Sequence, residues 1–559
     1  MASDKFTAFV RPAVSKTGWL LGLLLLGQYT GYSQAASRKY LVLLRDKANT
    51  PYSLSRPEQF LSQRSILRRQ KQNIPVLERD LPVNPAYITQ LRQTGAKIAF
   101  QSRWLNAVLV EATDAVIANV QKLAVVKGLE FGRSLSNARL EASVQAIPAA
   151  TASQARKLGA LEPLSYGTSL NQVTQLGVDR MHEQGYHGED ILIGVMDAGF
   201  LNADKVTFLK PLFDEQRVVA TYDFVDKETT VYEDDSHGLS CLSAIAGTVD
   251  NQLYGTAFKA RFVLLRTEDV ASESRLEEAN WVFGAEYADS AGVDVISSSL
   301  GYTQFDDVST SYTYQNLDGK TALSTRAAQV AAETGMVVVV AAGNEGNDSW
   351  RYLSAPSDAA SVLAIGAVNQ TGQRATFSSF GPSADGRVKP DLAARGQGTV
   401  IGDPGGSIVL GNGTSFATPL VAGLVAGFWQ AHPQLTAAQV TTALRQSGSQ
   451  FGNPDDALGY GIPNFERASV LAESFSELLI YPNPFSDVEP LSVFWGEVAP
   501  NVPLDATLTD LSGRVVWQRQ YNAGGVAAFA LPNLNLSAGL YVMTLVAGDK
   551  KRTVKLVKR

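Results

Sequence analysis

The chain places a serine in the stretch Gly413-Thr414-Ser415-Phe416-Ala417-Thr418-Pro419, directly before a long apolar run with helical spacing. This pattern predicts that the serine lies at the N-terminus of a buried helix. Free backbone N–H groups and the positive end of the helix dipole lie there, and both stabilise developing negative charge. A Gly-Thr-Ser sequence alone means little, because Ser and Thr are common helix caps. The stretch indicates a nucleophile only if the chain also supplies a base.

Two motifs that precede Ser415 supply the other groups. Asp197 ends an apolar strand predicted over residues 191–196, at the carboxyl edge where α/β folds place their sites. His237 precedes an amphipathic stretch of small residues, so we expect it in the first turn of a helix. A serine hydroxyl needs a base within hydrogen-bond reach. We therefore predict that His237 is that base and that Asp197 holds its tautomer.

A fourth polar residue follows another buried strand. The apolar residues 337–340 run into Ala341-Ala342-Gly343-Asn344, which places an Asn on a tight turn. Its side-chain amide and the backbone N–H of Ser415 would form an oxyanion hole. Each motif alone is a common turn or cap. Their joint occurrence at strand and helix ends favours a catalytic site.

Composition limits the class of protein. The 559 residues suffice for three or four domains, and 45% hydrophobic with 18% charged residues predicts a substantial core. The net charge of −6 argues against nucleic-acid binding as the main role. A single cysteine excludes an intramolecular disulfide, and the four histidines form no tight cluster with it that would indicate zinc.

The remaining histidines and the cysteine have simpler interpretations than catalysis. His182 and His187 lie near glycines and are predicted at the surface, and His432 is predicted to cap a helix C-terminus. Cys241 lies one turn after His237, and we interpret it as a small buried helix residue rather than a nucleophile.

The first residues are typical of an export signal. Basic residues precede the apolar residues 19–26, and small residues follow at 33–35, which predicts a signal peptide over residues 1–35. The alternative is a membrane anchor, but the apolar run is shorter than the roughly 20 residues that a spanning helix needs. We therefore expect no transmembrane anchor in the mature protein.

Three domains are predicted after the signal. Residues 37–135 combine short strands with helices and predict a small α+β domain. Residues 136–165 are predicted to form an exposed linker with a processing site, since such linkers concentrate proteolytic nicking. Residues 166–471 alternate apolar strands with amphipathic helices and predict a doubly wound, mostly parallel α/β sheet. Residues 474–559 predict a small all-β sandwich. The strands expected in the central domain cover residues 191–196, 218–223, 261–266, 293–298, 336–341 and 361–368.

The central domain, residues 166–471, resembles the subtilisin-like serine peptidase family at its main motifs. Asp197, His237 and Ser415 match the family's triad in its chain order, and Asn344 matches its oxyanion residue.

The resemblance also implies substrate-binding residues. Ser299-Leu300-Gly301 resembles the strand that pairs with the substrate backbone by β-augmentation. Ala341-Ala342-Gly343 resembles one wall of the pocket for the side chain before the scissile bond. Small residues in that wall would leave room for a sizeable apolar side chain.

The sequence departs from the family pattern near the triad. Leu239 and Ser240 follow His-Gly where the family usually has Thr and a second His. Ala198 replaces the usual Thr or Ser after the Asp, and Phe416 replaces the usual Met after the Ser. None of these changes removes a catalytic group, but they place the chain in a divergent branch.

The flanking domains resemble two further families. Residues 37–135 resemble the inhibitory propeptide of such peptidases in position, size and element order. The C-terminal domain resembles the type IX secretion sorting domain of Bacteroidetes, and the alternative is a generic β-sandwich accessory or carbohydrate-binding module. The matching residues are Tyr481-Pro482-Asn483-Pro484-Phe485, Asp510-Leu511-Ser512-Gly513, Leu536-Ser537-Ala538-Gly539-Leu540-Tyr541 and the basic C-terminal residues.

Together these patterns predict a secreted or cell-surface serine endopeptidase, exported through the periplasm and made as a self-inhibited precursor. Its partners would be protein or peptide substrates and the type IX secretion machinery. The alternative is a catalytically inactive, surface-displayed binding or adhesion protein on the same fold. A secreted esterase is a third hypothesis, but Ser415 lacks the Gly-x-Ser-x-Gly elbow.

No cofactor is required by the sequence, and structural calcium is left open without assigned ligands. Acidic loops at Glu233-Asp234-Asp235, Asp306-Asp307 and Asp455-Asp456 offer oxygen ligands. None has EF-hand spacing, and paired acids are often only a solvated surface.

Overall fold

The computed structural model describes residues 37–136, 164–474, 479–481, 483–486, 491–530 and 536–559. We call residues 37–136 the N-terminal domain, 164–474 the central domain and 479–559 the C-terminal domain. The predicted signal peptide and most of the predicted linker lie outside the described residues.

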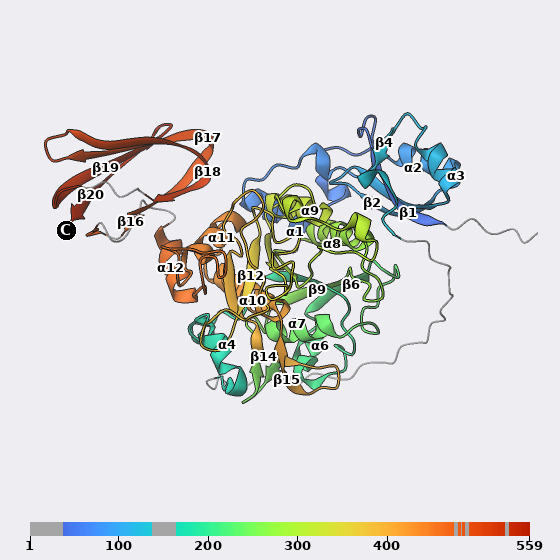
Figure 1. Cartoon of the computed structure of the whole chain (residues 1–559), viewed down its shortest axis with the longest axis horizontal. Helices are drawn as coiled ribbons and strands as arrows, with labels where there is room; N and C mark the ends of the chain where they lie inside the picture. The colour runs from blue at the N-terminus through green and yellow to red at the C-terminus, as the bar shows by residue number, and fades with distance from the viewer. Residues whose placement is uncertain (1–36, 137–163, 475–478, 482, 487–490, 531–535) are drawn as a thin grey trace, which may run out of the picture. The chain divides into compact units, whose positions relative to one another are not determined.

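The N-terminal domain is a four-stranded antiparallel sheet in the order β2-β3-β1-β4, with the helices over residues 85–93 and 114–120 packed beside it (Figure 1). Its strands are β1 (Arg38–Leu44), β2 (Lys97–Ser102), β3 (Ala107–Ala112) and β4 (Val126–Leu129). Its helices are α1 (Gln63–Lys71), α2 (Pro85–Gln93) and α3 (Asp114–Val120). The predicted α+β class is confirmed. The short β4, which contains a glycine, was not predicted.

The central domain is built on a seven-stranded sheet in the order β13-β12-β11-β10-β5-β9-β6. All its strand pairs are parallel, as predicted. The strands are β5 (Leu192–Asp197), β6 (Val218–Asp223), β9 (Arg261–Arg266), β10 (Val295–Ser298), β11 (Val337–Ala341), β12 (Leu363–Val368) and β13 (Leu392–Arg395).

Helices cover both faces of this sheet. Along β5, Ile193 and Val195 pack into the core on one face, while Leu192 and Met196 pack into the core on the other. The alternation follows from the two-residue period of a strand and confirms the doubly wound architecture. The longer helices are α7 (His237–Ala246), α8 (Arg275–Ala291), α9 (Leu323–Glu333), α10 (Thr414–Ala431), α11 (Ala437–Gln446) and α12 (Phe465–Ser474).

The two faces have different helices. Residues of α7, α10 and α11 pack in the first core, and residues of α8 and α9 pack in the second, where these two helices lie side by side (Figure 1). Smaller elements complete the domain: α4 (Leu170–Thr174), α5 (Val178–Glu183), α6 (Lys210–Asp214), the hairpin β7 (Thr248–Val249) and β8 (Leu253–Tyr254), and the hairpin β14 (Gln397–Gly402) and β15 (Ile408–Asn412).

The C-terminal domain is all-β, as predicted. Hydrogen bonds join its strands into one antiparallel sheet in the order β16-β17-β19-β20, with β18 also paired to β17. The strands are β16 (Leu479–Tyr481), β17 (Ser492–Asp510), β18 (Val515–Ala530), β19 (Gly539–Ala547) and β20 (Lys550–Lys558). The long β17 has register shifts against β18, which interrupt the regular ladder.

The N-terminal domain contacts helix α8 of the central domain through buried charges. Glu286 accepts hydrogen bonds from the backbone N–H groups of Arg103 (2.9 Å) and Trp104 (3.2 Å). Asp289, which is fully buried, forms ion pairs with Arg68, Arg69 and Arg103. Burial disfavours the charged carboxylate, but the arginines outweigh it and lower the pKa of Asp289.

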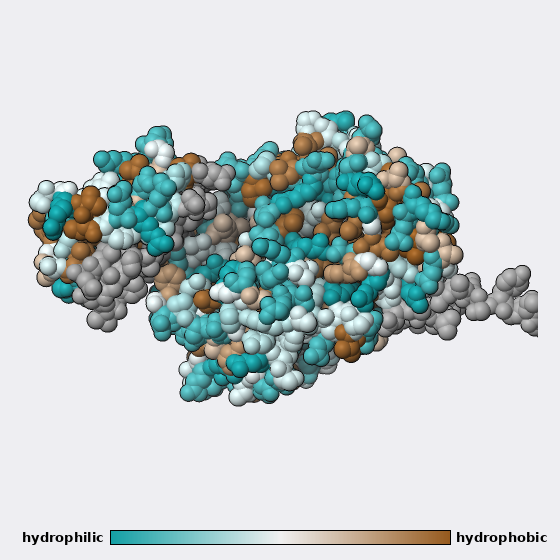
Figure 2. All heavy atoms as spheres, turned by 45° about the horizontal axis from the view of Figure 1, so that its top comes forward, coloured by the Kyte–Doolittle hydropathy of each residue, from teal (hydrophilic) through white to brown (hydrophobic). Residues whose placement is uncertain are grey.

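No helix among the described residues is long and apolar enough to cross a membrane. On the face shown in Figure 2, polar residues cover most of the central domain and apolar ones are scattered among them. Single exposed apolar side chains are usual on protein surfaces.

Replacing Asp289 with Asn should strongly destabilise the intact chain. The substitution leaves Arg68 and Arg69 buried without their carboxylate, and breaking a buried pair typically costs about 3–5 kcal/mol. The matched control is Glu333→Gln, because Glu333 pairs with Arg79 across the same two domains but is exposed. An exposed pair contributes about 0–1 kcal/mol. Urea unfolding measures the loss of unfolding free energy in both variants. Equal shifts of their midpoints would contradict the claim that Asp289 is buried among the arginines.

Candidate active site

Asp197 and His237 meet at the end of strand β5. The Asp197 side chain is fully buried, and its Oδ1 lies 2.7 Å from His237 Nδ1 and accepts the Ala198 N–H at 2.8 Å. Its second oxygen, Oδ2, is buried without a hydrogen-bond partner among the described residues. His237 is the first residue of α7, as predicted, and its backbone N–H donates to Asp235 Oδ1 at 2.7 Å.

The electrostatics of this pair stabilise the imidazolium that forms when His237 accepts a proton. The buried Asp197 carboxylate raises the pKa of His237 well above 6.5. Cys241 lies one turn further along α7, with Sγ 3.9 Å from His237 Nδ1. Burial raises the pKa of this thiol above 9.0, so it is neutral beside the imidazole near neutral pH. The prediction that Cys241 is a buried helix residue is confirmed.

Ser415 is the second residue of α10 and is 8% exposed. Its hydroxyl donates to the Ser299 carbonyl at 3.3 Å, while Ser299 Oγ donates to the Ser415 carbonyl at 2.8 Å. Within the described part of the chain, no hydrogen bond joins Ser415 Oγ to His237. The ring of the next residue, Phe416, lies 5.7 Å from the His237 ring between centroids. The start of α10 therefore faces the Asp197–His237 pair.

Asn344 lies in the exposed loop that follows β11. Its side-chain oxygen accepts hydrogen bonds from the Thr414 backbone N–H (2.8 Å) and hydroxyl (3.0 Å). These two bonds use only the amide oxygen of Asn344. They hold the amide group in place and leave its NH₂ group able to donate elsewhere. The first N–H groups of a helix have no intrahelical acceptor. The Thr414 N–H already donates to Asn344, whereas the Ser415 N–H has no such acceptor among the described residues. It therefore remains as a second donor beside the Asn344 NH₂ group.

The predicted substrate-binding residues lie after two neighbouring strands. Ser299-Leu300-Gly301 follows β10, and Ala341-Ala342-Gly343 continues from the end of β11, which pairs with β10 in parallel register.

Three polar residues beside these segments were not predicted. A Cβ at Gly301 would lie 2.1 Å from Ser354 Oγ, and a Cβ at Gly343 would lie 2.7 Å from Ser379 Oγ. Ser379 Oγ also donates to the Glu345 carboxylate at 2.8 Å. The small residues therefore make room for serine hydroxyls, and the surroundings are more polar than Ala-Ala-Gly suggests.

One sequence interpretation was wrong. His182 and His187 are buried at 5% and 6% exposure, because they pack against each other and against Phe258. Burial lowers the pKa of His182 to about 3, so it stays neutral. The nearby glycines had suggested a surface turn.

The departures from the family pattern fit the scaffold. Leu239 is fully buried in the core, and Ser240 Oγ donates to the Gly402 carbonyl at 2.9 Å.

His432 lies at the C-cap of α10, as predicted.

Comparison with known proteins identifies the families that the three domains match. The model of the subtilase family matches residues 188–461, the peptidase S8 propeptide domain of Bacteroidota matches residues 39–146, and the secretion system C-terminal sorting domain matches residues 479–559. Subtilisin NAT of Bacillus subtilis subsp. natto is 33% identical over 300 residues, covering 53% of this chain and 70% of its own. A subtilisin of Bacillus pumilus is 32% identical over 300 residues, covering 53% and 97%. The crystal structure of MycP1 from Mycobacterium smegmatis is similar at 22% identity and a TM-score of 0.42, covering 55% of this chain and 88% of that one.

The family model and the subtilisin relatives define a serine endopeptidase. The chain belongs to the subtilase family, and it carries that family's propeptide and a type IX secretion sorting domain. It is therefore the precursor of a secreted or cell-surface peptidase.

Titration of His237 tests the buried ion pair. The chain has four histidines, so ¹³C labelling of histidine allows each imidazole to be followed by NMR. We expect His237 to titrate above pH 6.5, and Asp197→Asn should lower its pKa because the substitution removes the negative charge that favours the imidazolium. His182 is the internal control and should stay neutral down to about pH 4. An unchanged His237 pKa in Asp197→Asn would contradict the contact described.

Proposed function

We propose that this subtilase hydrolyses peptide bonds through an acyl-enzyme on Ser415, with His237 as base and Asp197 as its orienting acid. The observation that carries the proposal is the 2.7 Å contact between His237 Nδ1 and the fully buried Asp197 carboxylate. A proton fixed on Nδ1 leaves Nε2 as the basic nitrogen.

The proposed reaction uses these groups in turn. His237 Nε2 takes the Ser415 hydroxyl proton as Oγ attacks the substrate carbonyl, and the imidazolium then protonates the leaving amine. Water then attacks the acyl carbonyl while losing a proton to the same nitrogen, and the imidazolium returns that proton to Ser415 Oγ as the acid is released. In the free chain the Ser415 hydroxyl instead bonds the Ser299 carbonyl. Catalytic hydrogen bonds are often long or misaligned without substrate and tighten in the complex.

The oxyanion would be held by two donors. The Asn344 amide is oriented by Thr414 through its oxygen, which leaves Nδ2 to donate. The Ser415 N–H lies at the positive end of the α10 dipole. Donors positioned in this way stabilise charge that develops in the transition state.

Substrate would bind in extended form along Ser299-Leu300-Gly301. The side chain before the scissile bond would pack beside Ala341-Ala342-Gly343, in surroundings that include the Ser354 and Ser379 hydroxyls. Ser354 Oγ is buried without a partner among the described residues, so it is available to a polar group.

The precursor would be processed in the linker 136–165, which separates the propeptide from residues 166–471. The sorting domain would direct the chain to the type IX machinery, and protein substrates would be met outside the cell. No nucleic-acid partner is proposed.

Ser415→Ala tests the nucleophile and the processing together. Wild type and variant, both expressed without residues 1–35, are followed by intact mass and casein hydrolysis. We expect wild type to lose its N-terminal domain and cut casein, while Ser415→Ala does neither, because it lacks the attacking hydroxyl. If wild type stays uncut, a trace of trypsin is added to remove the N-terminal domain. This control covers the case in which another protease activates the chain. If trypsin-cut wild type remains inert, the catalytic proposal fails.

Asn344→Ala should lower kcat by about 10²–10³ with little change in KM, because the lost donor acts mainly in the transition state. The matched control is Asn347→Ala, three residues further along the same exposed loop, which should keep wild-type kinetics. Hydrolysis of a chromogenic peptide gives both constants. A KM effect without a kcat effect would assign Asn344 to substrate binding instead.

A further inference from the structure

Acidic side chains gather between the start of α8 and the proposed substrate strand. Glu268 follows β9, Glu273 lies in the loop before α8, and Glu277 lies in the first turn of α8. One carboxylate oxygen from each lies within 4.8 Å of the others, and we call these three residues the glutamate cluster. Like charges this close repel one another, so a positively charged group between them would be stabilised.

Glu277 is buried in this cluster at 1% exposure. Its Oε2 accepts the Ser274 backbone N–H at 2.7 Å as part of the helix cap. Its other oxygen, Oε1, is buried and has no hydrogen-bond partner among the described residues. A buried carboxylate oxygen without a donor is rare and needs an explanation. A donor that arrives with a bound ligand would satisfy it.

Within the described ranges, no arginine or lysine forms an ion pair with the glutamate cluster. The only side chain of those ranges that donates to one of its carboxylates is Tyr302, whose hydroxyl lies 3.0 Å from Glu268 Oε2. In a neighbouring acidic group, by contrast, Arg266 forms an ion pair with every member: Asp223, Asp226 and Asp234. A positive charge for the glutamate cluster would therefore come from a ligand.

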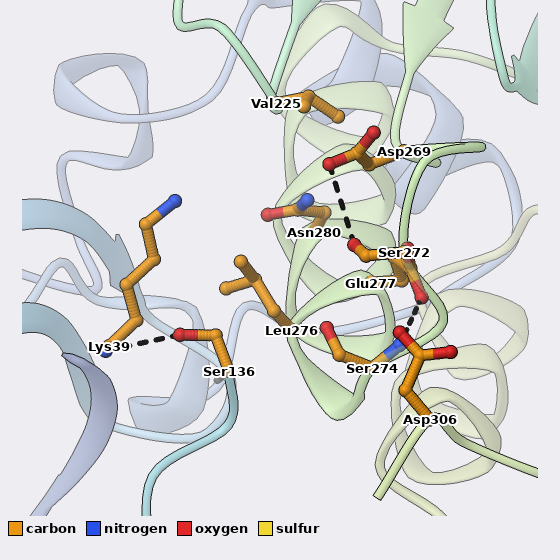
Figure 3. Close-up of a pocket in the computed structure, with 10 residues that line it drawn as sticks. All are labelled: Lys39, Ser136, Val225, Asp269, Ser272, Ser274, Leu276, Glu277, Asn280 and Asp306. Atoms are coloured by element: carbon orange, nitrogen blue, oxygen red, sulfur yellow. Dashed lines mark hydrogen bonds between the residues drawn. The ribbon is translucent and has the colours of Figure 1, made fainter. Parts of the chain in front are cut away.

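A cavity of about 150 Å³ opens beside Glu277 (Figure 3). Asp269 and Asp306 line it together with Glu277, so its wall on the side of the central domain is acidic. Lys39 and Ser136 of the N-terminal domain line the opposite side, as Figure 3 shows. The N-terminal domain therefore covers this cavity in the precursor, and its departure would open the cavity to a substrate.

The cavity adjoins the proposed substrate strand. Tyr302 directly follows Ser299-Leu300-Gly301 and reaches Glu268 through its hydroxyl. The Glu273 backbone N–H donates to Asp306 Oδ2 at 3.1 Å, and the Asp306 N–H donates to the Glu273 carbonyl at 2.9 Å. These bonds join the loop that follows the substrate strand to the loop before α8. A substrate on the strand would therefore pass beside the acidic wall.

The order of the strands indicates which substrate side chains would face the glutamate cluster. In the sheet, β11 lies on one side of β10, while β5 and β9 lie on the other. The proposed wall Ala341-Ala342-Gly343 and Glu268 therefore lie on opposite sides of the substrate strand. Successive side chains of an extended peptide point to opposite sides. If the first side chain before the scissile bond faces that wall, the second and fourth face the glutamate cluster.

We propose that the glutamate cluster is a substrate subsite for a basic side chain, lysine or arginine, at the second or fourth position before the scissile bond. Ammonium and guanidinium groups bring positive charge and donate several hydrogen bonds without needing an acceptor. Such charged donors bind carboxylates more strongly than neutral donors do. The proposal rests on the peptidase function proposed above, because it concerns which peptides that site prefers.

The test compares peptides that differ in a single charge. The chain is cut with immobilised trypsin, freed of its N-terminal fragment by size-exclusion chromatography and given N-acetylated p-nitroanilide peptides. Ala-Ala-Lys-Phe and Lys-Ala-Ala-Phe carry lysine at the second and fourth positions, and norleucine replaces the lysine in their neutral counterparts. We expect kcat/KM to be about tenfold or more higher for lysine at one of the two positions. High salt should reduce that preference, because it screens charges.

Glu277→Gln should remove most of the lysine preference. Glutamine keeps the helix cap, since its side-chain oxygen can still accept the Ser274 N–H. The matched control, Asp226→Asn, removes a carboxylate from the group paired with Arg266 and should keep the wild-type preference. If circular dichroism shows that Glu277→Gln does not fold, Glu273→Gln replaces it, because Glu273 is partly exposed.

Binding is measured separately, so that the subsite can be judged without turnover. Fluorescently labelled product peptides that end in a phenylalanine carboxylate are titrated into the trypsin-processed Ser415→Ala chain and followed by anisotropy. The lysine form should bind about tenfold more tightly than the norleucine form.

The outcomes separate this subsite from the proposed catalysis. Turnover of the norleucine peptides without a lysine preference at either position would overturn the subsite and support the catalysis. Tighter binding of the lysine form without turnover of any peptide would support the subsite and overturn the catalysis. Absence of both would overturn both. An unchanged preference in Glu277→Gln, or an equal loss in Asp226→Asn, would also overturn the subsite.

Discussion

The parallel register of four adjacent strands brings residues from distant parts of the chain to one edge of the central sheet. Strand β10 pairs with β5 on one side and β11 on the other, so that Ser298 is level with both Met196 and Val340. Strand β9 pairs with β5 in the same direction. The residues that end or follow these strands must therefore meet at one edge of the sheet, as parallel sheets require. Asp197, Ser299, Asn344 and Glu268 lie there for that reason.

The sheet was readable from the sequence because its strands are buried on both faces. Strands β6 and β9 were predicted with the bounds that the structure has, and β5, β10, β11 and β12 within two residues at either end. Their apolar, β-branched runs leave little ambiguity. Strand β13 was missed because Leu392–Arg395 is a short run without β-branched residues, and β15 because Ile408–Asn412 pairs in an exposed hairpin and has no buried face. Local pattern does not report such tertiary pairing.

The residues of the candidate site also divide into those with a local sequence signal and those without one. Asp197, His237, Asn344 and Ser415 each follow a strand or begin a helix, so their motifs carry a local signal. Ser354 and Ser379 carry none, because each meets a glycine that is distant in the sequence. Glu277 resembles an ordinary capping residue until the approach of Glu268 is known. Long-range contacts of this kind cannot be derived from spacing along one element.

The buried charges on α8 affect how a precursor of this design matures. Arg68, Arg69 and Arg103 all reach Asp289, and the two backbone N–H groups after Ser102 reach Glu286. None of these contacts involves residues 137–163. Cutting the chain within that segment would break its covalent connection and leave the ionic contacts in place. The cleaved product would then remain a two-piece complex, in which three guanidinium groups still surround a single carboxylate.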